Sequence, residues 1–207
     1  MSLSRRVVLA ARPDGIPQAQ HFRVEAYEPP TPKPGEIVVR NQFLSVEPAM
    51  RGWVSAVANY AEPVGIGEVM RSFASGEVIA SEHPGFRPGD KVTGMFGWQE
   101  VAVVPASAIS RKVTETDLPL STSLGVLGLN GVTAYFGLLD VGCPKPGDTV
   151  VVSTAAGSVG SAVGQIARLM GCRTVGIAGG AAKVRQCLDA FGYDVAIDYK
   201  ATNDLAA

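Results

Sequence analysis

The sequence predicts a β-rich domain over residues 1–120, followed by an α/β domain over residues 121–207 that forms the first half of a doubly wound parallel sheet. Short apolar runs broken by Pro and Gly fill the first part, a pattern typical of a partly open barrel or sandwich. In the second part, apolar runs of buried-strand type alternate with helical stretches. A Gly-rich turn joins the first of those strands to the next helix.

In the first domain, strands are expected at residues 6–10, 36–45, 75–81, 91–96 and 98–104. Several turns contain a Pro-Gly pair, such as Pro34-Gly35 and Pro88-Gly89, and each leads into a β-branched run. These turns are therefore expected to start strands.

In the second domain, helices are expected at residues 121–139, 158–170 and 181–191, and strands at residues 148–153, 173–178 and 194–198. A complete dinucleotide-binding sheet of the Rossmann type has six strands in two halves, so about three strands are expected to follow Ala207. The sequence therefore predicts an incomplete Rossmann domain.

The charge balance argues against nucleic acid and membranes as partners. The chain has 18 Lys and Arg residues against 19 Asp and Glu residues, with a net charge of -1, whereas a phosphate backbone selects a basic surface. No apolar run approaches the roughly 20 residues that span a bilayer, and residues 1–12 lack the apolar core of a signal peptide. A cytoplasmic protein is expected.

The cysteines and histidines predict no metal site and no disulfide framework. Cys143, Cys172 and Cys187 show no Cys-x-x-Cys spacing, and His21 and His83 lie far from them in sequence. All three cysteines are expected to be buried free thiols.

The Gly-rich turn carries the strongest chemical signal. Ala155, Gly157 and Gly160 occupy the three positions of the Gly-x-Gly-x-x-Gly fingerprint, with Ser158 and Val159 between the two glycines. Gly157 allows backbone amides to approach a pyrophosphate, and Gly160 allows the helix to lie close to the strand. The helix N-terminus adds its partial positive charge. Ala155 requires a turn without positive φ at that position.

The end of the second strand indicates which nicotinamide cofactor is bound. NAD-specific sites place an acid there to accept the ribose 2′-hydroxyl, but this chain has Gly179 and Gly180 after Ala178. The glycines leave room for a 2′-phosphate, and Lys183 can neutralise it from the first turn of the next helix. Arg185 is expected to be solvated. The sequence therefore predicts NADP(H).

Four motifs in order resemble one known family: EPAMRG at residues 47–52, GLNGVTAYFGLL at 128–139, AAGSVGSAVG at 155–164 and DYK at 198–200. They are similar to the zinc-independent medium-chain dehydrogenase/reductase superfamily, in the branch of prostaglandin reductases, leukotriene B4 dehydrogenases and alkenal double-bond reductases. The resemblance implies a GroES-like first domain before the Rossmann domain, and a homodimer.

The resemblance also implies NADPH-dependent reduction of the carbon–carbon double bond of α,β-unsaturated ketones and aldehydes, with hydride going to the β-carbon and no metal taking part. It assigns Tyr199 to the adenosine-phosphate end of the cofactor and Thr133 to the nicotinamide side. Thr133 could equally be a helix hydroxyl bonded to its own backbone. The catalytic acid or enolate stabiliser is expected beyond Ala207, so no catalytic residue is assigned.

The chain departs from the family at Ala49, where the branch has an aromatic residue that lines the substrate pocket. This leaves the substrate range open. Glu47 and Arg51, which flank Ala49, are expected to form a structural ion pair.

Two alternatives remain. One is an NADPH:quinone reductase of the same superfamily; a zinc-dependent alcohol dehydrogenase is disfavoured, because residues 44–46 and 64–68 lack its Cys and Gly-His-Glu ligands. The other is a non-catalytic NADP(H)-binding fragment. Turnover with an enone and with a quinone discriminates among them.

Overall fold

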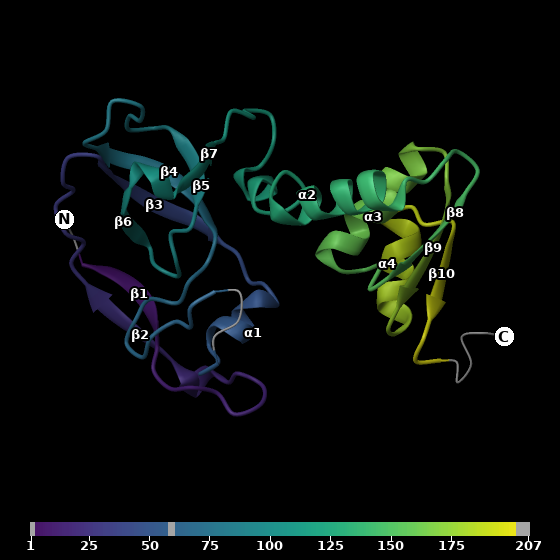
Figure 1. Cartoon of the computed structure of the whole chain (residues 1–207), viewed down its shortest axis with the longest axis horizontal. Coiled ribbons are helices and arrows are strands. Elements are labelled where there is room, and N and C mark those ends of the chain that lie inside the picture. Colours follow the sequence, from purple (N-terminus) through teal and green to yellow (C-terminus); the bar gives the residue numbers. More distant parts are fainter. Residues whose placement is uncertain (1–2, 58–60, 202–207) are drawn as a thin grey trace. The chain divides into compact units, whose positions relative to one another are not determined.

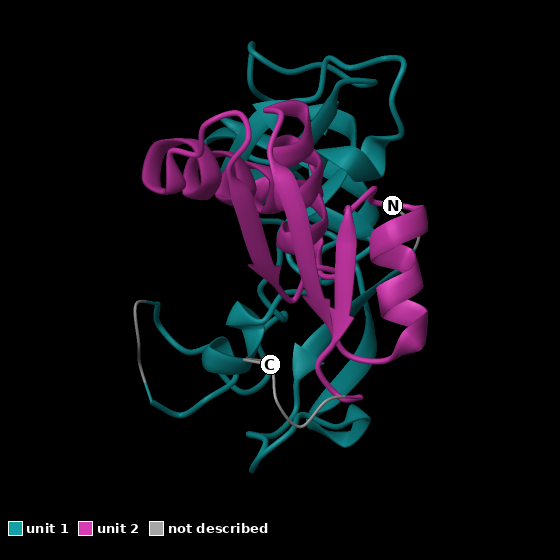
Figure 2. Ribbon diagram, turned by 90° about the vertical axis from the view of Figure 1, so that its right-hand side faces the viewer, with its two compact units in different colours: residues 1–124 teal, residues 125–207 magenta. Residues whose placement is uncertain are grey.

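The computed structural model describes residues 3–57 and 61–201. The chain divides into two compact units, Met1–Leu124 and Gly125–Ala207, which are coloured separately in Figure 2. The domain boundary expected at residue 120 falls at the 3-10 helix η3, Leu120–Ser123, at the end of the first unit. Each unit is described by itself below.

The first unit is built around an antiparallel sheet of five strands (Figure 1). Their order is β6-β3-β4-β5-β7. The strands are β3 (Glu36–Leu44), β4 (Ala74–Ser81), β5 (Lys91–Gly94), β6 (Val101–Pro105) and β7 (Ile109–Lys112). β3 pairs with both β4 and β6, so it is an interior strand, and its Ile37, Val38 and Val39 are fully buried.

A smaller sheet pairs β1 (Ser4–Leu9) with β2 (Phe22–Tyr27), antiparallel. β1 also forms isolated bridges from Arg6 to Gln99 and from Val8 to Val69. Short helices complete this unit: η1 (Ala19–His21), α1 (Ala49–Trp53) and η2 (Ala106–Ala108).

Two apolar clusters form the core of the first unit. One packs the five-stranded sheet and contains Ile37, Val39, Ala74, Val78, Val92, Phe96 and Ala102. The other lies around α1 and contains Leu9, Met50, Trp53, Val54, Val64 and Met70. The second cluster anchors α1, because Met50 and Trp53 are the buried residues of that helix.

The sequence analysis did not identify β2 and β7. The apolar residues of β2 do not alternate between buried and exposed positions, because Val24 is largely exposed and the neighbouring Arg23 and Glu25 form an ion pair. β7 has only four residues, ISRK, of which two are charged. In β7 the two-residue hydrophobic period from which strands are predicted is therefore missing. β2 does show this period, since apolar and polar residues alternate from Phe22 to Ala26, and the signal was overlooked.

The second unit contains three parallel strands in the order β10-β9-β8. They are β8 (Thr149–Ser153), β9 (Arg173–Ala178) and β10 (Val195–Asp198), linked by the helices α3 (Ser158–Leu169) and α4 (Ala181–Asp189). This order and these crossovers are those of the first half of a Rossmann sheet. The predicted alternation of strands and helices is confirmed.

The helices pack against the face of the sheet to which Val150 and Val152 of β8 point. Val151 points to the opposite face and is 60 % exposed. On β9 the same alternation buries Thr174, Gly176 and Ala178 and leaves the residues between them partly exposed. One face of the sheet is therefore covered within the described residues and the other is open, although the apolar run of β8 predicts burial on both faces.

The single helix expected over residues 121–139 is wrong. The segment contains η3, then turns, then α2 (Leu129–Phe136), which continues into the π-helix η4 (Gly137–Gly142). Gly131 explains part of this break, because a Cβ on it would lie 1.7 Å from the carbonyl oxygen of Val126. The preceding loop folds directly onto the first turn of α2.

The expectation of three buried cysteines is wrong for one of them. Cys172 and Cys187 are buried free thiols, but Cys143 is exposed. Cys143 ends η4 in the left-handed conformation with a φ of 46°, and its Sγ donates to the Asp140 carbonyl oxygen.

None of the described helices is long and apolar enough to cross a lipid bilayer.

Candidate functional site

A cavity of about 340 Å³ lies at the carboxyl ends of the parallel strands, where open α/β sheets bind their ligands. We call it the strand-end cavity. Its lining is Ser153, Thr154, Ala156, Gly157, Ile177, Ala178, Gly179, Lys183, Tyr199 and Lys200. It brings together four of the residues predicted for the cofactor site: Gly157, Gly179, Lys183 and Tyr199.

In the phosphate-binding turn, the residue with a left-handed backbone is Thr154, which directly precedes the first position of the glycine fingerprint. Thr154 has a φ of 54°, whereas Ala155 has no positive φ, as expected. A Cβ on Gly160 would lie 2.4 Å from the carbonyl oxygen of Thr154. Glycine at position 160 is therefore what allows α3 to start directly against the turn.

The first turn of α3 provides backbone amides for an anion. Gly157 is the N-terminal capping residue, and no side chain caps the helix. By helix geometry the amides of Ser158 and Val159 have no acceptor within α3, so they remain available together with the positive end of the helix dipole. Ser158, Val159 and Gly160 lie in this turn beside the strand-end cavity, although their atoms do not line it.

The end of β9 carries no acid, but the end of β10 does. The carboxylate of Asp198 accepts hydrogen bonds from the backbone amides of Gly180, at 2.8 Å, and Lys200, at 3.0 Å. These two bonds hold the pKa of the Asp198 carboxyl below its ordinary value. The carboxylate therefore orders the Gly179–Gly180 loop through the backbone.

Two lysines face the strand-end cavity. Lys183 lies in the first turn of α4, and Lys200 follows β10. Within residues 3–57 and 61–201 neither ammonium group forms an ion pair. Tyr199 stands between β10 and Lys200, and its ring is about half exposed. Two unpaired cations beside an aromatic ring suit an adenosine group with a phosphate.

These residues fit a 2′-phosphorylated dinucleotide. The Gly157–Gly160 turn forms a cradle in which a Cβ on Gly160 would collide with backbone, and α3 directs free amides toward it. The two lysines supply positive charge at the other end, and no carboxylate lines the strand-end cavity. The pyrophosphate in the middle of such a dinucleotide and the 2′-phosphate on its adenosine ribose therefore each meet a complementary group.

The structure does not bring Thr133 into this cavity. Thr133 lies on α2, and its hydroxyl donates to the Leu129 carbonyl oxygen at 2.8 Å. This is the backbone-bonded state that the sequence left open as an alternative. Arg185, on the exposed side of α4, does not line the strand-end cavity either.

Lys200 is the residue that sequence reasoning missed. It belongs to the DYK motif, but no role was assigned to it because it follows the strand rather than starting a helix. The signal that could have found it is its position directly after a strand end in a parallel sheet, beside Tyr199.

The segment around Glu47 lines a separate cavity of about 250 Å³ in the first unit, which we call the α1 cavity. Its lining is Pro17, Phe22, Val46, Glu47, Pro48, Met50, Arg51, Val54, Met70 and Trp98. The expected ion pair between Glu47 and Arg51 is absent from this described segment. Instead, Glu47 accepts a hydrogen bond from the Ser45 hydroxyl at 2.8 Å. Arg51 is therefore not neutralised by its neighbour.

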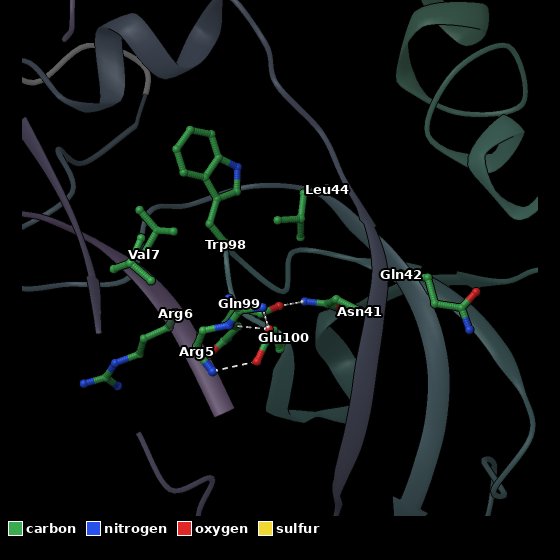
Figure 3. A pocket seen from close by; sticks show the side chains of 10 residues that line it. Arg5, Arg6, Val7, Asn41, Gln42, Leu44, Trp98, Gln99 and Glu100 are labelled. Carbon is green, nitrogen blue, oxygen red and sulfur yellow. Dashed lines mark hydrogen bonds and ion pairs between the residues drawn. The ribbon is translucent and has the colours of Figure 1, made fainter. Parts of the chain in front are cut away.

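A third cavity of the first unit, of about 260 Å³, is also lined by Trp98 (Figure 3). In Figure 3 the Asn41 amide points toward Gln99, whose carbonyl oxygen accepts its hydrogen bond at 2.8 Å. The other end of that amide, Oδ1, is buried without a partner. Arg5 and Glu100 form an exposed ion pair. Trp98 lines both cavities, and its indole donates a hydrogen bond of 3.2 Å to the Ser45 carbonyl oxygen.

Metal-ligating side chains do not cluster in the part of the chain that the structure describes. Over residues 3–57 and 61–201, no three His, Cys, Asp or Glu side chains gather closely enough to hold an ion.

Comparison with known proteins gives a family match and close relatives. Residues 5–112 match the family model described as the N-terminal domain of oxidoreductase. The chain is 45 % identical over 198 residues to the NADPH-dependent curcumin reductase of Escherichia coli (strain K12), a match that covers 96 % of this chain and 57 % of that protein. It is 40 % identical over 173 residues to the NADP(+)-dependent 2-alkenal reductase of Nicotiana tabacum, covering 83 % and 50 %.

Among solved structures, the chain resembles CurA from Vibrio vulnificus in complex with NADPH. The TM-score is 0.87 at 47 % sequence identity, over 95 % of this chain and 58 % of that one. The chain thus spans little more than half the length of the relatives it matches.

Proposed function

Because the chain belongs to the zinc-independent branch of the medium-chain dehydrogenase/reductase superfamily, we propose that it binds NADP(H) and reduces the carbon–carbon double bond of α,β-unsaturated ketones and aldehydes. The family predicted from the four sequence motifs is confirmed by the match over residues 5–112 together with the relatives that are 40 % and 45 % identical over most of the chain. The fold prediction, a GroES-like domain followed by part of a Rossmann domain, is confirmed as well.

The observation that carries the cofactor proposal is the pair of lysines at the strand-end cavity. Lys183 and Lys200 lie where a 2′-phosphate would reach, and β9 ends in Ala178 without the acid that would repel it. Two relatives carry NADPH or NADP(+) in their names, and the Vibrio vulnificus structure holds NADPH. These findings support NADP(H) over NAD(H).

NADPH, when bound, supplies a hydride to the β-carbon of the enone, and the α-carbon is then protonated. The residues of this chain contribute binding and orientation. The first turn of α3 would hold the pyrophosphate, and Lys183 and Lys200 would hold the 2′-phosphate. Fixing the pyrophosphate and the 2′-phosphate holds the adenosine half of the cofactor, which limits the motion of the nicotinamide attached to the pyrophosphate and lowers the entropic part of the barrier.

The α1 cavity supports an apolar substrate. Most of its lining is apolar, with Phe22, Met50 and Trp98 among the walls. Glu47, Pro48, Met50 and Arg51 also line it, and they belong to the motif at residues 47–52 that resembles the branch. Ala49 takes the place of an aromatic residue there and is packed against the core cluster around α1. Ala49 therefore belongs to the core around α1 rather than to the lining of the cavity.

The proposal is tested by incubating the protein with NADPH and either a conjugated enone or a quinone, followed by mass spectrometry of the product. With deuterium on the transferred position of NADPH, we expect the saturated ketone, with the label on its β-carbon and the carbonyl intact. Turnover of the quinone alone would favour the quinone reductase alternative. NADPH binding without turnover of either substrate would favour a non-catalytic NADP(H)-binding role.

Two expectations from the sequence stay predictions. A cytoplasmic location is checked by fractionating cells that express the protein, and a homodimer by sedimentation equilibrium of the purified chain.

A further inference from the structure

Tyr193 lies buried directly behind the phosphate-binding turn. It follows α4 and precedes β10, and only 4 % of its surface is exposed. Its hydroxyl donates a hydrogen bond of 2.6 Å to the carbonyl oxygen of Gly160, in the first turn of α3. Tyr193 belongs to none of the motifs and does not line the strand-end cavity.

Two glycines make room for the Tyr193 ring. A Cβ on Gly164 of α3 would lie 2.3 Å from the Cζ atom of Tyr193, and a Cβ on Gly176 of β9 would lie 3.1 Å from its Cδ1 atom. The ring therefore fills the space between a helix and a strand that have no side chains at this level. Its thickness sets how far α3 stands from β9.

The hydroxyl is a permanent donor. Burial raises the pKa of Tyr193 to about 12. The proton therefore stays on the hydroxyl throughout the neutral pH range, and the bond to Gly160 does not titrate there.

We propose that Tyr193 is a positioning residue for the pyrophosphate end of the cofactor site, which holds the first turn of α3 in place through the Gly160 carbonyl. The proposal rests on the proposed binding of NADP(H). The amides of Ser158 and Val159 belong to the same turn as Gly160, so a displacement of this carbonyl displaces them too. The 2′-phosphate end, at Lys183 and Lys200, is held by other elements and does not depend on this contact.

The test compares two ligands on three proteins. NADPH contains the pyrophosphate, whereas adenosine 2′-monophosphate contains the adenosine and its 2′-phosphate but no pyrophosphate. Both are titrated calorimetrically into the wild type, Tyr193→Phe and Tyr135→Phe. Tyr135 is the matched control, because its hydroxyl is on the exposed surface of α2, away from the strand-end cavity. Circular dichroism establishes that each variant is folded at the temperature used.

In Tyr193→Phe we expect the Kd for NADPH to rise about fivefold, the loss typical of one hydrogen bond, while the Kd for adenosine 2′-monophosphate changes less than about twofold. Tyr135→Phe should leave both values unchanged. A second variant, Gly164→Ala, places a Cβ on α3 itself, 2.3 Å from the Cζ atom of Tyr193, so it pushes the ring away from α3 and is expected to give the same selective loss.

The inference is overturned if Tyr193→Phe binds NADPH as the wild type does, or if both ligands weaken equally, since equal weakening indicates a general loosening of the unit. Failure of the wild type to bind NADPH would overturn the proposed function itself. That result is seen before any variant is compared, so the two failures are distinguishable.

Discussion

The carboxylate of Asp198 accepts a hydrogen bond of 2.8 Å from the backbone amide of Gly180. Gly180 precedes α4 with a φ of 95°, a conformation that only glycine adopts readily. The bond crosses from the end of β10 to the loop after β9, which belongs to the predicted 2′-phosphate site. A negative side chain near a phosphate site is thus used to order the loop.

Replacing Asp198 separates its role as an acceptor from its charge. In Asp198→Ala the Gly180 and Lys200 amides both lose their acceptor, and we expect the Kd for NADPH to rise about tenfold. Asp198→Asn keeps an oxygen at the same position and should stay within about twofold of the wild type. Calorimetric titration measures both values. An Asn variant as impaired as the Ala variant would contradict this account of the loop.

Thr154 is a β-branched residue in the left-handed region, with a φ of 54°. Such a conformation costs on the order of 1–3 kcal/mol, and glycine adopts it without strain. We expect Thr154→Gly to raise the free energy of unfolding by about 1 kcal/mol, after the entropic cost of glycine in the unfolded chain is subtracted. Urea unfolding measures the change.

The control for this prediction is Ser153→Gly, one residue earlier in the extended strand β8. Glycine there relieves no strain and is expected to destabilise the protein by about 0.5–1 kcal/mol. If both glycine variants are destabilised to the same extent, Thr154 is not strained.

Two neighbouring valines test which face of the sheet each side chain of β8 points to. Val152 is 8 % exposed and packs under the helices, whereas Val151 is 60 % exposed on the open face. Val152→Thr buries a hydroxyl and is expected to cost about 1–3 kcal/mol. Val151→Thr should change the free energy of unfolding by less than about 0.5 kcal/mol. Equal losses, measured by urea unfolding of the same chain, would show that both faces are covered.

The elements from β8 to β10 could be predicted to within a few residues, because their signals are local. The run at residues 149–153, the glycines at 157 and 160 and the helical stretch behind them each have a recognisable pattern. The prediction of one helix over residues 121–139 was wrong, because it gave the apolar composition of this segment more weight than its glycines. The close approach of Gly131 to the Val126 carbonyl depends on how the preceding loop folds, and hydrophobic periodicity gives no information about it.

The cofactor site, too, could be predicted only in part. Gly157, Gly179, Lys183 and Tyr199 were predicted from motifs, and the structure gathers them at one cavity. Their role in binding stays a prediction. Lys200 was missed although its position directly after a strand end is a local signal. Tyr193 escaped prediction because its importance depends on a contact between segments distant in the sequence, the 2.6 Å bond to Gly160. A tyrosine after a helix carries no local signal that it supports a turn more than thirty residues earlier.

The central claim is that this chain selects a dinucleotide with a 2′-phosphate through Lys183 and Lys200. Its most direct test is the ratio of the Kd values for NADH and NADPH, measured by calorimetry on the wild type, the double variant Lys183→Ala/Lys200→Ala and the control Arg185→Ala. We predict that the wild type and the control bind NADPH at least about tenfold more tightly than NADH, and that the double variant binds both about equally. Equal affinities in the wild type, or a preference that survives the loss of both lysines, would contradict the claim.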